Sequence, residues 1–488
     1  MKYLALTGAT GLLGSYLLKD LLSQDIPVLA LIRSSRREIA RQRIEGILRY
    51  FESHLGRALP RPVIMETDLH KPELGLNKDQ IHWISQHVDA VVHSAASLAF
   101  QADEKGEPYV SNVAGLEHVL QMCQSANIRK FHHVSTCYVC GSRKGVVLET
   151  ELDEGQTFSN DYEKSKLEGE KMVHSCSFLD SLTIYRPAII VGDQHTGHTS
   201  TYNGFYTPIK IMLPFFDPTK ITDELFTAFS HSLGMNQSDR KNFVPVDWIS
   251  QVMTHVISRP ELHEKTYHLT AANRISMEDM TNAIIESIQK YVKVDADHPA
   301  MPFDSVDQLL KVFAGQMEMY KSYWRDDPEF DMTNTIQAAP QLPPPTVTYE
   351  TLLRLIRFAI QSKCGWPRPK PTPLENDVQQ VFDAYDKSAD SQLADAPLDG
   401  SFSLRVIGRG GGDWTVNQNN GQTKIYQGLV NAPDVPMLTM RGETFQRLPE
   451  MSDADILVNV TWKNMPIEKE AQSIQALRDI KLKTVKAE

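Results

Sequence analysis

The chain has 488 residues, of which 41% are hydrophobic and 23% are charged, and its formal net charge is −11. This length exceeds one ordinary hydrophobic core, so two or three domains are expected. The negative charge argues against nucleic acid or an anionic membrane as the main partner. The five cysteines are scattered, no apolar run approaches the roughly 20 residues of a transmembrane segment, and the first predicted strand starts at Lys2. We therefore expect a cytoplasmic protein with no disulfide framework.

The first 190 residues alternate short apolar runs with helical patterns. Helices are predicted at Leu12–Leu22 and, as a long basic amphipathic segment, at Arg36–Leu55. Strands without polar alternation, separated by helices, indicate a parallel sheet that is covered on both faces, and so an α/β fold. The predicted strands are Tyr3–Leu6, Val28–Ile32, Val63–Glu66, Ala90–His93, Phe131–Ser135 and Leu182–Arg186.

Beyond Asp193 the alternation of apolar runs and helical patterns becomes less regular, and the C-terminal part shows a different pattern of predicted elements. Helices are predicted at Trp248–Ser258, Ser276–Val292 and Tyr349–Ser362, and four prolines between Trp366 and Pro373 mark a linker. A strand at Phe402–Ile407, a hairpin around Asn420-Gly421, a strand at Leu457–Trp462 and a helix at Ile467–Val485 then indicate a separate α+β domain. The predicted division is 1–365 (a core of 1–192 and a substrate-binding part of 193–365), a linker of 366–374 and a domain of 375–488.

A glycine-rich segment stands directly between the first predicted strand and the first predicted helix. It reads Thr7-Gly8-Ala9-Thr10-Gly11-Leu12-Leu13-Gly14, with its glycines three residues apart. A tight turn of this kind brings backbone N–H groups to a pyrophosphate at the helix N-terminus, and its last glycine lets helix and sheet approach closely. We predict that a dinucleotide contacts Gly8, Thr10, Gly11, Leu12, Leu13 and Gly14.

The end of the second predicted strand indicates NADP rather than NAD. Arg33 stands where an acidic residue would hydrogen-bond the ribose 2′-hydroxyl of NAD, and Ser34, Ser35, Arg36 and Arg37 follow. A guanidinium fits a 2′-phosphate, and no carboxylate stands in this segment to repel it. We predict NADPH as the cofactor. Arg33 is the predicted phosphate contact, whereas Arg36 and Arg37 also fit the solvated start of a helix.

Other segments offer further cofactor contacts. Asp68 and Leu69 follow the third strand and are predicted near adenine, and the small residues Ser94, Ala95 and Ala96 let the chain pass close to the cofactor. Asn112 lies in a helical stretch, where it is either a cofactor contact or a surface amide. No metal site is predicted, because Cys137 and Cys140 have no second pair of ligands nearby.

Two side chains four residues apart, Tyr162 and Lys166, share one face of a predicted helix. An ammonium beside a phenol favours the phenolate, so we expect a Tyr162 pKa below its ordinary value of about 10. Tyr162 would donate a proton to the oxygen of a carbonyl under reduction, while Lys166 also holds the nicotinamide ribose. Thr136, at the end of the fifth strand, would supply a second hydroxyl to that oxygen.

These motifs together resemble the extended short-chain dehydrogenase/reductases, and more narrowly their acyl-thioester reductase branch, which includes fatty acyl-CoA reductases. The resemblance covers roughly residues 1–365 and is strongest to Gly192. It rests on the glycine-rich segment and on the segments Asp68–Leu76, Val88–Ser97, His133–Val139 and Tyr185–Gly192.

The resemblance implies a Rossmann-type doubly wound sheet, NADPH, and Thr136, Tyr162 and Lys166 as the catalytic residues. The implied reaction reduces a hydrophobic acyl thioester, carried by CoA or an acyl-carrier protein, to an aldehyde. A second hydride would give the alcohol, and the sequence leaves aldehyde and alcohol open as the final product. Two alternatives stay open: another extended-family enzyme acting on a ketone, hydroxysteroid or nucleotide sugar, and a non-catalytic NADP-binding regulator. A homo-oligomer is compatible with either.

The C-terminal part resembles the sterol carrier protein type 2 family of lipid-binding domains. The resemblance rests on Gly400–Leu404, Pro433–Met440 and Glu443–Phe445. It implies an α+β domain with an apolar cavity that delivers an acyl chain to the reductase, whereas the alternative is an unrelated packing or dimerisation domain.

Overall fold

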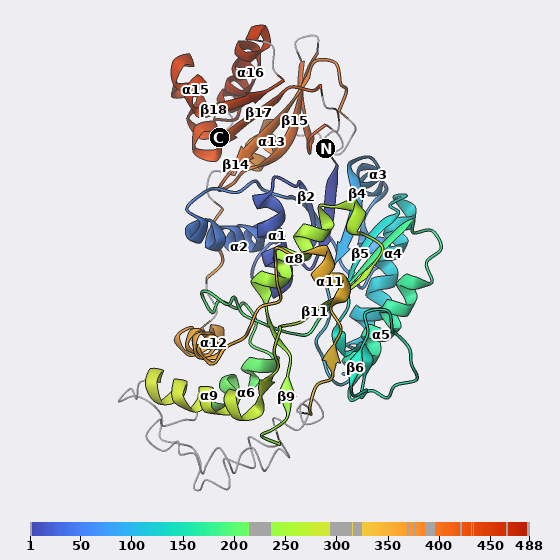
Figure 1. Ribbon diagram of the computed structural model, residues 1–488. Coiled ribbons are helices and arrows are strands. Elements are labelled where there is room, and N and C mark those ends of the chain that lie inside the picture. The colour runs from blue at the N-terminus through green and yellow to red at the C-terminus, as the bar shows by residue number, and fades with distance from the viewer. Residues whose placement is uncertain are drawn as a thin grey trace.

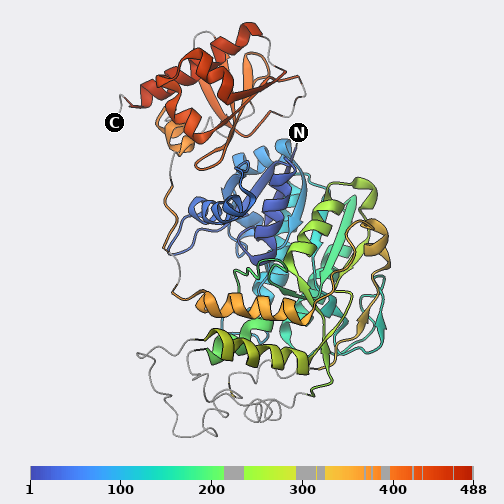
Figure 2. The same cartoon turned by 60° about the vertical axis from the view of Figure 1, so that its left-hand side comes forward.

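The structure is a computed structural model that describes residues 2–213, 236–292, 315, 325–367, 370–374, 377–385, 396–419, 422–430, 432, 434–464 and 467–485. Figure 1 shows a large part built around one sheet, with a smaller part stacked on it beside the N-terminus. Figure 2 shows residues 370–374 running along one side of the molecule between the two parts. The predicted turn residues Asn420 and Gly421 lie outside the described residues.

The large part contains a sheet of seven parallel strands in the order β11-β7-β5-β4-β1-β2-β3. The chain reverses direction across the sheet between β1 and β4, so the carboxyl ends of these two strands border the crevice where ligands bind in open α/β sheets. This arrangement confirms the predicted Rossmann-type fold. The strands are β1 (Tyr3–Thr7), β2 (Val28–Ile32), β3 (Val63–Glu66), β4 (Val88–His93), β5 (Lys130–Val134), β7 (Ser181–Pro187) and β11 (Thr266–Leu269).

Helices cover both faces of this sheet, which is why its strands carry apolar residues without alternation. Alternate residues of β2 serve different cores: Ala30 and Ile32 pack into one buried cluster and Leu29 and Leu31 into the other. The first cluster lies under α1 (Leu12–Ser23), α2 (Ala40–Leu55) and α8 (Val246–Ile257), and the second under α3 (Lys78–His87), α4 (Gly115–Ser125) and α5 (Asp161–His174).

The helix predicted from Arg36 begins four residues later, at Ala40. Two serine hydroxyls accept hydrogen bonds from backbone N–H groups in this region. Ser35 Oγ accepts the N–H of Glu38 (2.9 Å), and Ser34 Oγ accepts the N–H of Ala40 (2.9 Å). Such side-chain bonds compete with helical ones, so the segment after β2 stays a loop.

A second group of helices lies beyond the carboxyl ends of the strands (Figure 1). It comprises α6 (Thr207–Met212), α9 (Met277–Tyr291) and α12 (Tyr349–Gln361). Three short strand pairs belong to the same part: β10 (Phe243–Pro245) with β8 (Ile189–Val191), β12 (Ile275–Ser276) with β9 (Arg240–Lys241), and β13 (Glu329–Phe330) with β6 (Val146–Val147). The helices predicted at Trp248–Ser258, Ser276–Val292 and Tyr349–Ser362 therefore exist within one or two residues of their predicted ends.

The smaller part is the predicted α+β domain. Its five-stranded sheet has the order β16-β15-β14-β17-β18, and β14 runs parallel to β17 while the other pairs are antiparallel. One sheet face packs against helices around Phe382, Trp414 and Leu477. The elements are α13 (Val378–Tyr385), β14 (Ser401–Ile407), β15 (Gly412–Asn419), β16 (Gln422–Gln427), β17 (Met437–Arg441), α14 (Gly442–Arg447), α15 (Asp453–Asn459), β18 (Val460–Lys463) and α16 (Ile467–Val485).

The strand predicted at Leu457–Trp462 starts only at Val460, because its first three residues end α15. Ser452 caps this helix by accepting the N–H of Asp455 at 3.2 Å. Within the described residues, no helix combines the length and the apolar character that a bilayer crossing requires.

The other face of the small sheet contacts the amino end of β1. The Tyr3 phenol, only 1% exposed, donates to Asp413 Oδ2 (3.2 Å) and accepts the N–H of Leu429 (3.0 Å). Asp413 also receives both arms of the Arg405 guanidinium, each at 2.9 Å. Nearby, Trp83 Nε1 donates to the carbonyl of Gln427 (3.0 Å). The first strand of the chain is thus hydrogen-bonded to the last domain.

Removing the Tyr3 hydroxyl should weaken this junction measurably. Tyr3→Phe leaves a buried carboxylate oxygen and a buried N–H each short of one partner, so we expect the free energy of unfolding to fall by about 1–3 kcal/mol. Denaturant unfolding followed by circular dichroism measures the change. The control is Tyr349→Phe, which removes a hydroxyl bonded to Glu286 on the surface and should shift the free energy by less than about 0.5 kcal/mol. Equal losses in both variants would contradict the expectation.

Candidate functional site

The glycine-rich turn after β1 forms a backbone cradle that side chains would fill. Gly8 has a φ of +74°, and a Cβ on it would lie 2.7 Å from the Ala95 nitrogen. A Cβ on Gly14 would lie 2.0 Å from the Gly8 carbonyl oxygen, so neither position accepts a side chain. Gly11 is exposed and caps α1 without a side-chain hydrogen bond, which leaves the first N–H groups of the helix available. These features fit the pyrophosphate of a dinucleotide.

The ends of β1 and β4 are joined by one hydroxyl. Thr7 Oγ1 accepts the N–H groups of Ser94 (3.2 Å) and Ala95 (3.3 Å) and lies 2.9 Å from His93 Nδ1. Burial lowers the pKa of His93 to about 3, so this imidazole is neutral and Nδ1 can accept the hydroxyl proton. The predicted contacts Ser94, Ala95 and Ala96 therefore lie beside the glycine turn.

The predicted phosphate contact Arg33 is exposed at the end of β2. A second guanidinium, which was not among the predicted contacts, comes from α2: Arg43 donates to Thr10 Oγ1 (2.7 Å) and to the Arg33 carbonyl (2.6 Å). The sequence could have indicated Arg43 only if the helix after β2 had been predicted to begin at Ala40, which places Arg43 in its first turn. Two cations thus lie at the end of the glycine turn.

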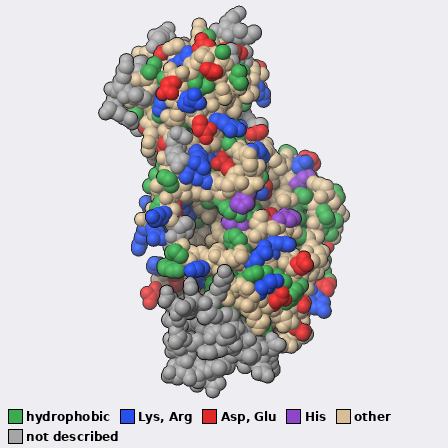
Figure 3. Space-filling model, turned by 90° about the vertical axis from the view of Figure 1, so that its left-hand side faces the viewer, with side chains coloured by type: hydrophobic (Ala, Val, Ile, Leu, Met, Phe, Trp, Pro, Cys, Tyr) green, Lys and Arg blue, Asp and Glu red, His purple; other side chains and the backbone are tan. Residues whose placement is uncertain are grey.

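A carboxylate also reaches this loop, which the sequence pattern did not predict. Glu66, the last residue of β3, accepts a hydrogen bond from Ser34 Oγ at 2.6 Å. The segment Arg33–Arg37 itself carries no carboxylate, as the sequence indicates, but the neighbouring strand β3 supplies one. Figure 3 shows that Lys and Arg side chains recur on the face that carries α2 and α12, despite the negative net charge.

Asp68 and Leu69 lie after β3, as predicted. Asp68 Oδ1 accepts the N–H of His70 (3.1 Å), and the Leu69 carbonyl lies 2.7 Å from His118 Nδ1 on α4. These bonds fix the conformation of the loop after β3, and the contact of Asp68 and Leu69 with adenine stays a prediction.

Asn112 lies in a π-helical turn, Val110–Ala114, that precedes α4. Its amide oxygen accepts the N–H of Ser97 (2.8 Å), and its amide nitrogen donates to the Ser97 carbonyl (3.1 Å) and to Ser165 Oγ (2.9 Å). Both N–H groups of this amide are used within the protein. Asn112 therefore holds the loop after β4 against the helix of Tyr162, and its predicted cofactor contact stays a prediction.

The three predicted catalytic residues converge at the carboxyl end of β5. Lys166, 2% exposed, donates from Nζ to the carbonyl of Val134 at 2.8 Å, and burial lowers its pKa to about 8. Thr136 follows β5, and its hydroxyl donates to the Pro187 carbonyl (3.2 Å) and accepts the N–H of Tyr138 (3.3 Å). Tyr162 hydrogen-bonds with Thr136.

The expected lowering of the Tyr162 pKa is wrong for this structure. Burial raises the pKa of Tyr162 to about 12, against the hydrogen bond with Thr136, which acts to lower it. Lys166 is not among the groups that shift this pKa, and its ammonium group donates to the Val134 carbonyl. Tyr162 is accordingly a phenol that holds its proton. In the described ranges, no group of three or more His, Cys, Asp or Glu side chains is arranged to hold a metal ion.

Comparison with solved structures supports the fold. The chain is similar to the terminal R domain from the myxalamid PKS-NRPS biosynthetic pathway (TM-score 0.57, 22% identity, 76% of this chain and 92% of that one). It is also similar to a thiolation-reductase di-domain from an archaeal non-ribosomal peptide synthetase (TM-score 0.52, 18% identity, 74% of this chain and 75% of that one).

Among curated proteins, the chain is similar to a linear gramicidin synthase component of Brevibacillus parabrevis (27% identity, 57% of this chain and 5% of the relative). It is similar to the L-2-aminoadipate reductase large subunit of Penicillium chrysogenum (25% identity, 57% of this chain and 20% of the relative). A third relative is aldehyde reductase lnaA of Aspergillus flavus (25% identity, 74% of this chain and 36% of the relative). The chain thus spans little more than a third, at most, of the length of these relatives.

Residues 6–253, half of the chain, match the model of an NAD-binding family described as "Male sterility protein". This match covers the end of β1, the glycine turn, all three converging residues and the first eight residues of α8. The chain belongs to this family, within the extended short-chain dehydrogenase/reductases, as its motifs had indicated.

Proposed function

We propose that this protein is a cytoplasmic NADPH-dependent reductase that converts a hydrophobic acyl thioester to the aldehyde, and in a second reduction to the alcohol. The thioester is carried by CoA or by an acyl-carrier protein. The observation that carries the proposal is the convergence of Thr136, Tyr162 and Lys166 at the carboxyl end of β5, beside a backbone cradle that suits a dinucleotide.

The hydroxyls of Thr136 and Tyr162 are suited to polarise a thioester carbonyl. NADPH supplies, when bound, the hydride that this carbonyl carbon receives. Tyr162 then gives its proton to the oxygen, and Thr136 stabilises the developing negative charge. The resulting hemithioacetal releases the thiol and leaves the aldehyde. Lys166, cationic below its pKa of about 8, lies four residues along the same helix, and its charge favours the phenolate that remains.

The names of relatives support a thioester substrate. Two similar structures are a terminal R domain and a thiolation-reductase di-domain, and similar curated proteins are called aminoadipate reductase and aldehyde reductase. The thiolation domain in the second of these structures supports a substrate that is delivered on a carrier. Arg33 and Arg43 support NADPH over NADH, since a guanidinium group can bind the 2′-phosphate. Of the two carboxylates at this loop, Glu66 is bound by Ser34, and Glu38 interacts electrostatically with Arg43.

A role in lipid binding for the C-terminal domain belongs to the same proposal. Its interior between sheet and helices is filled by side chains such as Phe382 and Trp414. A pocket of about 740 Å³ lies instead on the other sheet face, where Ile407, Met437 and Leu429 meet Pro60 of the reductase part. This volume is within the usual range for ligand pockets. We propose that it binds a lipid near the amino end of β1, apart from the thioester that reacts at the carboxyl ends of the strands.

The reaction is tested by incubating the full chain with NADPH and a series of acyl-CoA or carrier-bound thioesters of increasing chain length. We expect free thiol and aldehyde in step with NADPH oxidation, and faster turnover of longer chains. Tyr162→Phe should lower kcat by about 10²- to 10⁴-fold because the proton donor is lost. The control Tyr109→Phe removes a hydroxyl bonded to Asp161 and should leave kcat unchanged. The proposal fails if no thioester yields thiol, or if Tyr162→Phe retains full activity.

The rate should fall in alkaline solution as Lys166 loses its charge. Lys166 is protonated below its pKa of about 8, whereas the pKa of Tyr162, about 12, keeps the phenol protonated throughout. We therefore expect kcat/KM to decline above about pH 8, since this quantity reports groups of the free enzyme. Lys166→Arg should move the decline to higher pH, because a guanidinium keeps its proton there. An unchanged alkaline limb in this variant would assign the decline to another group.

Arg43 should determine the preference for NADPH. A charge-assisted bond to phosphate contributes roughly 1.5–3 kcal/mol, so Arg43→Gln should raise the Kd for NADPH about 10- to 100-fold. The Kd for NADH should change little, because NADH has no 2′-phosphate. Fluorescence titration measures both constants. Arg57→Gln, at the other end of α2 and exposed, is the control. Equal effects of Arg43→Gln on the two nucleotides would refute a phosphate contact.

A further inference from the structure

Helix α2 is bound from one side by the C-terminal domain and its linker. Arg41 in its first turn forms an ion pair with Asp377 (2.6 Å) and donates to the carbonyl of Gly410 (3.2 Å). Along the same helix, Arg49 donates to the carbonyl of Pro373 at 2.7 Å. The linker therefore runs along α2 before the C-terminal domain begins.

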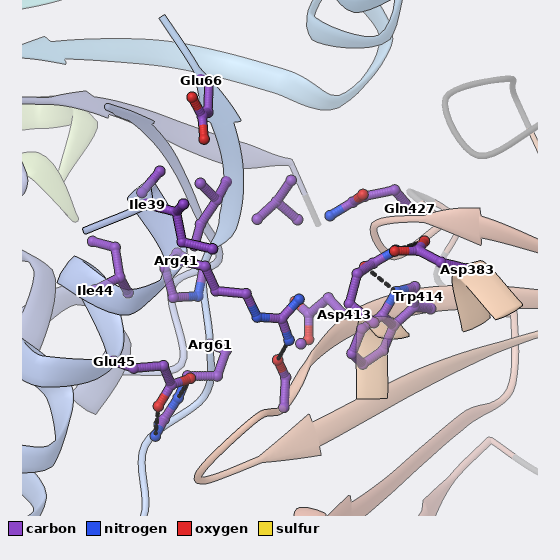
Figure 4. A pocket seen from close by; sticks show the side chains of 17 residues that line it. Ile39, Arg41, Ile44, Glu45, Arg61, Glu66, Asp383, Asp413, Trp414 and Gln427 are labelled. Carbon is purple, nitrogen blue, oxygen red and sulfur yellow. Dashed lines mark hydrogen bonds and ion pairs between the residues drawn. The ribbon is translucent and has the colours of Figure 1, made fainter. Parts of the chain in front are cut away.

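The Arg41–Asp377 pair is largely removed from water, with side chains 20% and 6% exposed. Burial lowers the pKa of Arg41 and raises that of Asp377. The charge of each residue acts against the pKa shift of its partner. Figure 4 shows the Arg41 side chain extending from α2 into the pocket between the two parts, toward the strand that carries Asp413 and Trp414. A desolvated pair of this kind fixes one geometry, because neither charge has water as a substitute partner.

The opposite side of the same helical turn carries the candidate cofactor contact. Arg41 and Arg43 are two residues apart, which places them about 200° apart around a helix of 3.6 residues per turn. While Arg41 reaches the C-terminal domain, Arg43 reaches Thr10 in the glycine turn and the carbonyl of Arg33. One helical turn thus connects the C-terminal domain to the loop where the 2′-phosphate would lie.

We propose that Arg41, through its ion pair with Asp377, is a positioning residue that holds α2 so that Arg43 meets the 2′-phosphate of NADPH. This inference rests on the proposed NADPH specificity and goes beyond it, because it gives the C-terminal domain a part in cofactor selection. Without the pair, the first turn of α2 loses its outer attachment and Arg43 loses its fixed distance from Thr10. The hydride-transfer residues lie at β5 and α5, away from this contact.

The experiment compares two nucleotides that differ only in the 2′-phosphate, 2′,5′-ADP and 5′-ADP, by titration calorimetry on the full chain. We expect Arg41→Gln to raise the Kd for 2′,5′-ADP by about fivefold or more, the lower end of coupling between linked sites, and that for 5′-ADP by less than about twofold. In turnover, KM for NADPH should rise by the same factor while kcat stays constant. Asp377→Asn should reproduce the effect, and the double variant should match either single variant.

The matched control is Arg478→Gln. Arg478 is an equally buried arginine of the C-terminal domain (18% exposed) that pairs with Asp453 at 2.8 Å, away from α2. Circular dichroism confirms that each variant is folded before titration. Wild-type affinity in Arg41→Gln, or equal losses in Arg41→Gln and Arg478→Gln, overturns the inference while NADPH specificity stands. If the wild-type protein binds both nucleotides equally, the proposed specificity itself is wrong, and the inference falls with it.

Discussion

The close approach of the β1–α1 turn to the end of β4 is the constraint on which the rest of the site depends. The turn passes so near the neighbouring loop that Gly8 and Gly14 have no space for a side chain. The Thr7 hydroxyl then ties the two strand ends together by accepting two N–H groups from Ser94 and Ala95. Because parallel strands present their carboxyl ends at one edge, this junction also determines where β5 and its Thr136 lie.

The chemistry at that edge is governed by burial more than by attraction between charges. An ammonium four residues from a phenol suggests a phenolate, yet desolvation raises the pKa of Tyr162 and lowers that of Lys166. The ammonium group of Lys166 donates a hydrogen bond to the Val134 carbonyl. The site therefore holds an uncharged acid, Tyr162, and a cation, Lys166, with a pKa of about 8, which suits proton donation to a carbonyl oxygen.

The C-terminal domain is joined to the reductase part by buried polar contacts rather than by a flexible tether alone. Tyr3, Trp83 and Arg41 all bond to it, and they come from the first strand, α3 and α2. Buried hydrogen bonds and ion pairs require one relative placement of their partners, since a shift leaves polar groups unsatisfied. Such a junction is consistent with a domain that acts on the reductase rather than one that merely accompanies it.

The sequence by itself determined the local features, because these depend on short-range patterns. Uninterrupted apolar runs identified the parallel strands, with Val28–Ile32 and Val63–Glu66 placed without error, and glycine spacing identified the cofactor turn. The family followed from motifs that lie close together in the chain. Tertiary structure alone decided which distant groups meet: Arg43 and Glu66 reach the loop after β2 from α2 and β3, and Asp377 reaches Arg41 from another domain. The Tyr162 pKa was likewise beyond the sequence, since burial is a property of the packed chain and no spacing of residues encodes it.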